Sequence, residues 1–315
     1  MSDGLYTDYG AGQDVSALHT ALYRGAIARF RDLPPVRTLA ALTQAMLEAR
    51  FAPHPPIETH RHYGETELAE AYAQAQREFA NAPEIKAAWR AVWEAAGLDP
   101  ETTARDRLQL RFQPPHPPGG ERRWARSTAT VSFHRDTWGT NLYAQVNWWA
   151  PVYPLSAGRT FAFFPELFGQ PLGNSSLEFD IAEVMRRNRE APASVGKGEM
   201  VPRLLEEIDW SQARPVTIAS GEIIAFSSQH AHAGVQNHTD LTRISIETRT
   251  LNIPDHLAGR GAPNVDGHAR WATPGMFRRV SDGRPLTEVL GVEPFEPFVA
   301  RTASVGGDPV EDHAG

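Results

Sequence analysis

Potential metal ligands are densest in residues 133–136, which read Phe-His-Arg-Asp. In an extended strand the side chains at positions i and i+2 project from the same face, so the His134 imidazole and the Asp136 carboxylate can bind one ion together. A third ligand is available much later in the chain, where His230 and His232 alternate on one face of a predicted strand. Two histidines and one carboxylate on one face of an octahedron leave positions open for other ligands, as in non-haem Fe(II) oxygenases. A lone His-x-Asp is weak evidence because it also occurs by chance, and a hydrogen-bonded core histidine is the plain alternative for His134.

Composition narrows the possible chemistry. The 315 residues include no cysteine, which excludes disulfides, zinc–thiolate sites, thiolate-held iron–sulfur clusters and thiol nucleophiles. Any metal must therefore be bound by His, Asp or Glu. The net charge of -7 is spread along the chain, so we expect no nucleic-acid partner. The chain shows neither a signal-peptide pattern nor an apolar stretch of membrane-spanning length, so we expect no membrane association and a cytoplasmic location.

The elements that must position these residues change character along the chain. From residue 15 to residue 97 apolar residues recur at helical spacing, first at Leu18, Leu22, Ala26 and Phe30, with a proline break at residues 33–35. Two further helices are predicted over residues 65–81 and 83–97. A helical N-terminal region, residues 1–104, is therefore expected to pack on the rest of the protein.

From residue 105 short β-rich runs separated by Gly, Pro, Asn and Asp dominate, which is typical of an antiparallel sandwich or barrel. We predict a mainly β fold with α additions, its core over residues 105–251 and an extension over residues 252–315. An insertion at 170–212 is expected to hold a helix at 177–189 and a mobile segment at 191–200, and the chain end is expected to fray after Ser304. The predicted strands are residues 108–112, 128–133, 143–152, 160–164, 216–219, 223–227 and 243–251.

The motifs resemble the 2-oxoglutarate-dependent oxygenases of the double-stranded β-helix (jelly-roll, cupin-like) fold, and among them the phytanoyl-CoA dioxygenase-like branch. That pattern is His-x-Asp, a long interval, and a distal His followed about eleven residues later by Arg. His134, Asp136, His232 and Arg243 fit it in order. The resemblance covers residues 108–251. This chain departs from the branch at two places. It has Glu222 where the branch often has Asp, and it has Val-Gln at residues 235–236 where the branch has a single Pro.

The resemblance implies Fe(II) held by His134, Asp136 and His232, with 2-oxoglutarate as co-substrate and O2 as oxidant. His230 stays open as an alternative third ligand, although it does not fit the family register. Arg243 is expected to bind the distal carboxylate of 2-oxoglutarate, because a guanidinium binds a carboxylate through two hydrogen bonds and stays charged when buried. Arg249 is the weaker alternative for binding this carboxylate. The plain alternative for Arg243 is a structural ion pair. Two residues of the strand after the metal motif, Gln145 and Asn147, are expected to hydrogen-bond the co-substrate or the substrate.

The resemblance also implies the reaction, in which 2-oxoglutarate yields succinate and CO2 while an unactivated C–H bond is hydroxylated. Asp136 argues against halogenation, because halogenases of this kind lack that carboxylate. We expect a small metabolite as substrate, with bacterial specialised metabolism as a setting. The alternatives are a non-enzymatic β-helix protein that binds a metal or ligand, and a cupin-type metalloenzyme that does not use 2-oxoglutarate. A weaker candidate for a second metal site is the group His54, His60 and His62. A weaker candidate for steering an anionic group is the set Arg122, Arg123 and Arg126.

Overall fold

The computed structural model describes residues 4–116, 130–190 and 201–298. The predictions for residues 128–129, for the arginines at 122, 123 and 126, for segment 191–200 and for the chain end after residue 304 lie outside the described residues.

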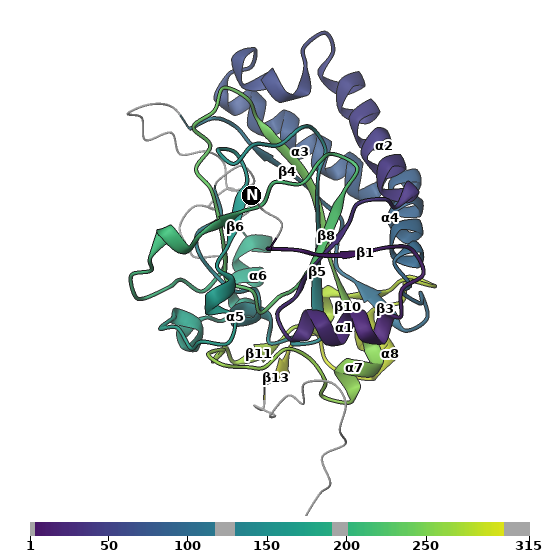
Figure 1. Ribbon diagram of the computed structural model, residues 1–315, viewed down its shortest axis with the longest axis vertical. Coiled ribbons are helices and arrows are strands. Elements are labelled where there is room, and N and C mark those ends of the chain that lie inside the picture. Colours follow the sequence, from purple (N-terminus) through teal and green to yellow (C-terminus); the bar gives the residue numbers. More distant parts are fainter. Residues whose placement is uncertain (1–3, 117–129, 191–200, 299–315) are drawn as a thin grey trace, which may run out of the picture.

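A large, almost entirely antiparallel sheet forms the centre of the molecule (Figure 1). Only the β1–β2 pair is parallel, and β4 pairs with β10 off the main path. β10 is the longest strand and pairs with β5 on one side and with β3 and β4 on the other. In spatial order the strands are β1 (Thr7–Tyr9), β2 (Ile27–Phe30), β8 (Ile223–Ser227), β5 (Gln145–Pro151), β10 (Arg243–Asn252), β3 (Thr103–Arg105) and β12 (Arg278–Arg279), with β4 (Gln109–Gln113) beside β10.

Two smaller sheets complete the β structure. The first is antiparallel and consists of β7 (Arg214–Pro215), β6 (Phe161–Phe163) and β9 (His232–Gly234). An isolated bridge between His134 and His232 extends it by one position. The second pairs β11 (Trp271–Ala272) with β13 (Glu296–Pro297).

Helices gather on one side of the large sheet. Figure 1 shows α2, α3 and α4 packed together, away from α5 and α6. The α-helices are α1 (Val15–Tyr23), α2 (Pro34–Phe51), α3 (Glu65–Asn81), α4 (Pro83–Ala95), α5 (Thr137–Thr140), α6 (Ile181–Glu190), α7 (Ile253–Leu257) and α8 (Leu286–Leu290). The 3-10 turns are η1 (Pro56–Arg61), η2 (Pro165–Leu167), η3 (Ser175–Glu178), η5 (Trp210–Gln212) and η6 (Pro274–Met276).

The large sheet is covered on both faces, so β5 and β8 are buried along their whole length. Trp148 and Ala225 belong to a core shared with the N-terminal helices, whereas Trp149 and Phe226 belong to a second core shared with Phe161 of the small sheet. Successive residues of a strand point to opposite faces, so each strand supplies both cores. The second face, between the two sheets, holds the site described below.

A sheet-rich fold with helical additions is confirmed. The helix expected over 65–81 and the strand over 223–227 have the predicted bounds. The helical expectation is wrong at residues 27–30, which form β2: Gly25, at φ 95°, ends the preceding helix turn, and the strand then pairs with β8. Helical spacing in the sequence cannot reveal that distant partner. The expected strand at 216–219 is also absent, because the pairing lies two residues earlier, in β7.

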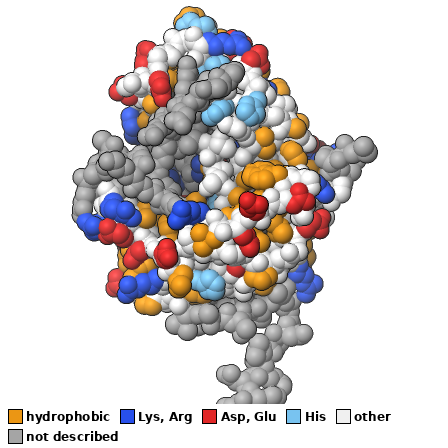
Figure 2. All heavy atoms as spheres, turned by 90° about the vertical axis from the view of Figure 1, so that its left-hand side faces the viewer, with side chains coloured by type: hydrophobic (Ala, Val, Ile, Leu, Met, Phe, Trp, Pro, Cys, Tyr) orange, Lys and Arg blue, Asp and Glu red, His pale blue; other side chains and the backbone are white. Residues whose placement is uncertain are grey.

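On the face shown in Figure 2, acidic, basic and hydrophobic side chains are interspersed, so the described residues there form no continuous patch of one charge. Within the described ranges, no helix has the length and apolar character needed to cross a bilayer.

Candidate metal centre

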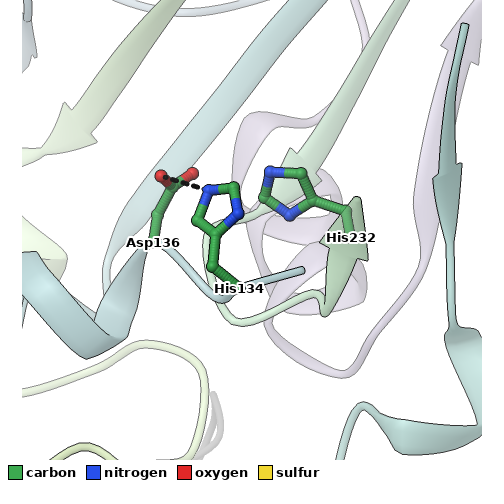
Figure 3. Close-up of side chains that lie close together, drawn as sticks. All are labelled: His134, Asp136 and His232. Atoms are coloured by element: carbon green, nitrogen blue, oxygen red, sulfur yellow. Dashed lines mark ion pairs between the residues drawn. The ribbon is translucent and has the colours of Figure 1, made fainter. Parts of the chain in front are cut away.

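Three potential ligands from two distant parts of the sequence meet beside the small sheet. One ligand atom from each of His134, Asp136 and His232 lies within 4.8 Å of the others, and Figure 3 shows the three side chains converging. His232 is the first residue of β9 and exchanges two backbone hydrogen bonds of 3.0 Å with His134. Asp136 does not continue that extended segment. Its backbone is helical (φ -64°, ψ -32°) and it is the N-cap of α5, so a turn, not simple strand alternation, brings its carboxylate beside His134.

Backbone carbonyls fix both imidazoles in a state suited to metal binding. His134 Nδ1 lies 2.8 Å from the carbonyl oxygen of Ser132, and His232 Nδ1 lies 2.9 Å from that of His230. A carbonyl only accepts, so each Nδ1 carries the proton and each Nε2 presents a lone pair. Such hydrogen bonds orient histidine ligands in metal sites.

The charges of the cluster also suit a cation. Burial, followed by the proximity of His134, lowers the pKa of His232 to about 4, so this imidazole is neutral at pH 7. Burial alone would raise the pKa of Asp136, but Arg249 and the two histidines hold it well below its usual range. Two imidazoles and one carboxylate are the ligand types expected for non-haem iron.

His230 lies outside this cluster. Its Nε2 is 3.0 Å from the carbonyl oxygen of Gly25, and its ring packs against Phe163 and Phe168. Burial lowers the pKa of His230 to about 3, which keeps the ring uncharged. The structure therefore brings His232, and not its neighbour, to the other two ligands.

A cavity of about 80 Å³ opens beside the three ligands and is lined also by Asn147 and Arg243. By this measure a water molecule needs roughly 10–15 Å³, so the cavity accommodates several water-sized groups. Arg243 is 8% exposed, and its Nε and Nη1 have no hydrogen-bond partner among the described residues. Ser245 lies two residues further along the same strand face and is fully buried, and its Oγ is likewise unpartnered in the described structure. Burial lowers the pKa of Arg243 to about 10, which still leaves it charged at pH 7.

Arg249 is already occupied. Its Nη2 donates to Asp136 Oδ1 at 2.9 Å, and its Nη1 lies 3.4 Å from Asp106 Oδ2. Between the two arginines that the sequence placed on this strand face, Arg243 is thus the one with free donors. Asp106 could not be recognised from the sequence, because its role depends on Arg249, which lies far along the chain.

The two amide residues of β5 lie at different depths. Asn147 lines the cavity and donates from Nδ2 to Asp136 Oδ2 at 2.5 Å. Gln145 is fully buried and does not line the cavity; its Nε2 donates to Ser228 Oγ at 2.6 Å, and Ser228 in turn donates to Asn147. Gln145 therefore helps to orient Asn147 through Ser228 and does not itself face the cavity.

The His54, His60 and His62 group does not form a second cluster of this kind. The rings of His54 and His62 stack 3.8 Å apart, while His60 Nδ1 is 3.0 Å from Thr242 Oγ1. Within the described ranges, His134, Asp136 and His232 are the one group of three or more such side chains with metal-binding geometry.

No protein-family model and no curated protein matches the sequence. Several solved structures show limited similarity in fold. EvdO2 from Micromonospora carbonacea var. aurantiaca, complexed with 2-oxoglutarate, is 14% identical with a TM-score of 0.42, over 78% of this chain and 94% of that chain. The apo form of the non-heme monooxygenase ThoJ is 16% identical with a TM-score of 0.41, over 84% and 80%. The non-heme alpha ketoglutarate dependent carbocyclase SnoK from nogalamycin biosynthesis is 14% identical with a TM-score of 0.40, over 92% and 96%. At these values the similarity is weak, so function must be inferred from the residues of the site.

Proposed function

We propose that the chain is a non-haem Fe(II)- and 2-oxoglutarate-dependent dioxygenase that hydroxylates an unactivated C–H bond of a small metabolite, releasing succinate and CO2. The observation that supports this most directly is the pairing, in one cavity, of a His-His-Asp cluster with a buried guanidinium that has unpartnered donors. In a metal-binding protein without an anionic ligand, such an arginine would remain a buried cation with unpaired donors. An unsatisfied buried polar group costs about 1–3 kcal/mol, and more when it is charged.

The residues divide between the two proposed ligands. His134 and His232 would bind iron through Nε2, and Asp136 through a carboxylate oxygen. Arg243 would hold the distal carboxylate of 2-oxoglutarate through a bidentate contact, with Ser245 Oγ as a further donor. Asn147 keeps a second amide N–H beyond the one donated to Asp136, so it can contact the co-substrate from the cavity wall. The bound iron and 2-oxoglutarate would supply the oxidation by O2.

The rest of the cavity wall indicates what kind of substrate fits. Phe161, Phe226 and Trp149 form an apolar side. The cavity is also lined by Arg111 and Glu247, which form an ion pair whose side chains stay 31% and 21% exposed. We propose a small organic molecule with an apolar body and at least one polar group directed at this pair.

We further propose that the two facing sheets are a double-stranded β-helix and that the chain is one catalytic unit. The N-terminal region, residues 1–104, supplies β1 and β2 to the large sheet as well as helices to its outer face. The core, residues 105–251, supplies every proposed ligand, and residues 252–315 form an extension.

Anaerobic titration of the metal-free protein with Fe(II) and then 2-oxoglutarate tests the proposal. A weak visible charge-transfer band should appear only when both are present, and aerobic incubation with candidate metabolites should form succinate. Metal binding without a 2-oxoglutarate response would instead indicate a cupin-type metalloenzyme or a non-enzymatic metal-binding protein. Binding of neither would overturn the proposed metal centre together with the proposed function.

A further inference from the structure

The carboxylate of Asp136 is held at both oxygens by protein donors. Asn147 Nδ2 donates to Oδ2 at 2.5 Å, and Arg249 Nη2 donates to Oδ1 at 2.9 Å. These two donors are not independent, because Arg249 and Asn147 are register partners on the neighbouring strands β10 and β5. Side chains directly opposite one another in an antiparallel pair start about 4.5–5.5 Å apart. The pair therefore reaches Asp136 as a clamp built into the large sheet, although Asp136 itself lies on the loop that enters α5.

Arg249 is in turn matched by a second carboxylate. Asp106 Oδ2 lies 3.4 Å from its Nη1, and the Asp106 side chain is only 5% exposed. The backbone N–H of Asp106 donates to the carbonyl oxygen of Arg249 at 2.9 Å, which fixes the two residues relative to each other. The result is a chain of charges, Asp106–Arg249–Asp136, in which both carboxylates are buried and the arginine side chain is 20% exposed, and which ends at a proposed metal ligand.

Each carboxylate oxygen has two lone pairs, so one hydrogen bond still leaves a lone pair on Asp136 Oδ1 for a metal ion. That oxygen lies 3.6 Å from His134 Nε2, so it is the oxygen on the side of the histidine ligands. Arg249 thus contacts the oxygen that is placed to bind metal and draws electron density from it, while Asn147 holds the other oxygen and stops the carboxylate from rotating.

We propose that Arg249 is a positioning residue for the metal centre: it fixes Asp136 as a ligand through one oxygen, and Asp106 is present to orient and neutralise Arg249. This inference rests on the proposed metal site but not on the use of 2-oxoglutarate. A role confined to structure predicts instead that Arg249 serves only to pair with Asp106.

Co(II) titration of the metal-free protein, followed by calorimetry and by visible absorption, distinguishes these roles. Arg249→Gln should weaken Co(II) binding by about 10–100-fold, the usual effect of losing a residue that orients a metal ligand. It should also change the Co(II) absorption bands, which report the coordination of the ion. Arg249→Lys should recover part of the affinity, because it restores the charge without the planar fork.

Arg249→Gln leaves Asp106 buried without its cation and is therefore liable to unfold. The double variant Asp106→Asn/Arg249→Gln leaves no unpaired charge at position 106 and should therefore unfold at a higher temperature than Arg249→Gln alone, yet keep the weak Co(II) binding and the altered bands. Arg243→Gln is the matched control: it removes a buried cation from the same face of β10 without touching Asp136, so it should leave Co(II) binding unchanged when no co-substrate is added.

Wild-type Co(II) affinity and bands in the double variant would overturn the inference and show that Arg249 acts for Asp106 alone. A wild-type protein that binds no Co(II) would overturn the metal site and this inference together. A protein that binds Co(II) as expected in every variant but never responds to 2-oxoglutarate would contradict the proposed function and leave the role of Arg249 standing.

Discussion

Substitution of Arg243 removes the buried guanidinium that we assign to the distal carboxylate of 2-oxoglutarate. The carboxylate would then be buried without a cation, and breaking a buried ion pair by removing one partner costs about 3–5 kcal/mol. Because every ~1.4 kcal/mol is tenfold, Arg243→Met should weaken 2-oxoglutarate binding between roughly a hundredfold and a few thousandfold. Arg249 cannot take over, because its donors are bound to Asp136 and Asp106.

The same substitution should act in the opposite direction on stability. Without a ligand, Arg243 is a buried cation whose Nε and Nη1 lack partners in the described structure, and methionine replaces it with an apolar chain that needs none. The free energy of unfolding of the ligand-free protein should therefore rise by about 1 kcal/mol or more. Opposite signs for binding and stability are expected of a functional residue and not of a structural one.

Calorimetric titration of the Zn(II)-loaded protein with 2-oxoglutarate measures the binding, and thermal unfolding without ligand measures the stability. Arg111→Met is the matched control: Arg111 lines the same cavity, but it is paired with Glu247, so its loss should lower stability and affect 2-oxoglutarate less. If Arg243→Met binds 2-oxoglutarate like the wild type while Arg111→Met does not, Arg111 holds the distal carboxylate and our assignment is refuted.

Three further predictions concern histidines and the metal. Alanine at His134, Asp136 or His232 should abolish Co(II) binding and turnover while a cooperative thermal transition remains; full activity in Asp136→Ala would contradict the ligand set. His230→Ala should still bind Co(II) but unfold at lower temperature, because the ring is fully buried; loss of the metal with a stable fold would make His230 the ligand. Burial lowers the pKa of His19, so the unfolded chain binds the extra proton and stability should fall as the pH drops below about 6.5. Urea unfolding across this range should show a smaller loss for His19→Gln, and an identical profile would contradict this account.

The sequence alone indicated the ligand types, their order along the chain and the strand that carries Arg243 and Arg249. This was possible because strand alternation and helical spacing are local properties: β8 and α3 have their predicted bounds, and the distal strand places Arg243 and Arg249 on one face. The absence of cysteine likewise restricted any metal site to His, Asp and Glu before the fold was known.

Only the tertiary structure decided which of these residues meet and which partners they already have. Residues 27–30 became a strand because β8 offers a pairing edge, a contact that no local pattern records. Alternation places His230 and His232 on the same strand face, but the hydrogen bond of His230 to the Gly25 carbonyl and the packing of its ring keep His230 out of the cluster. Arg243 and Arg249 are equivalent in alternation. The fold places Asp106 and Asp136 against Arg249 and not against Arg243, because β3, β5 and β10 lie side by side. Arg243 therefore keeps the free donors.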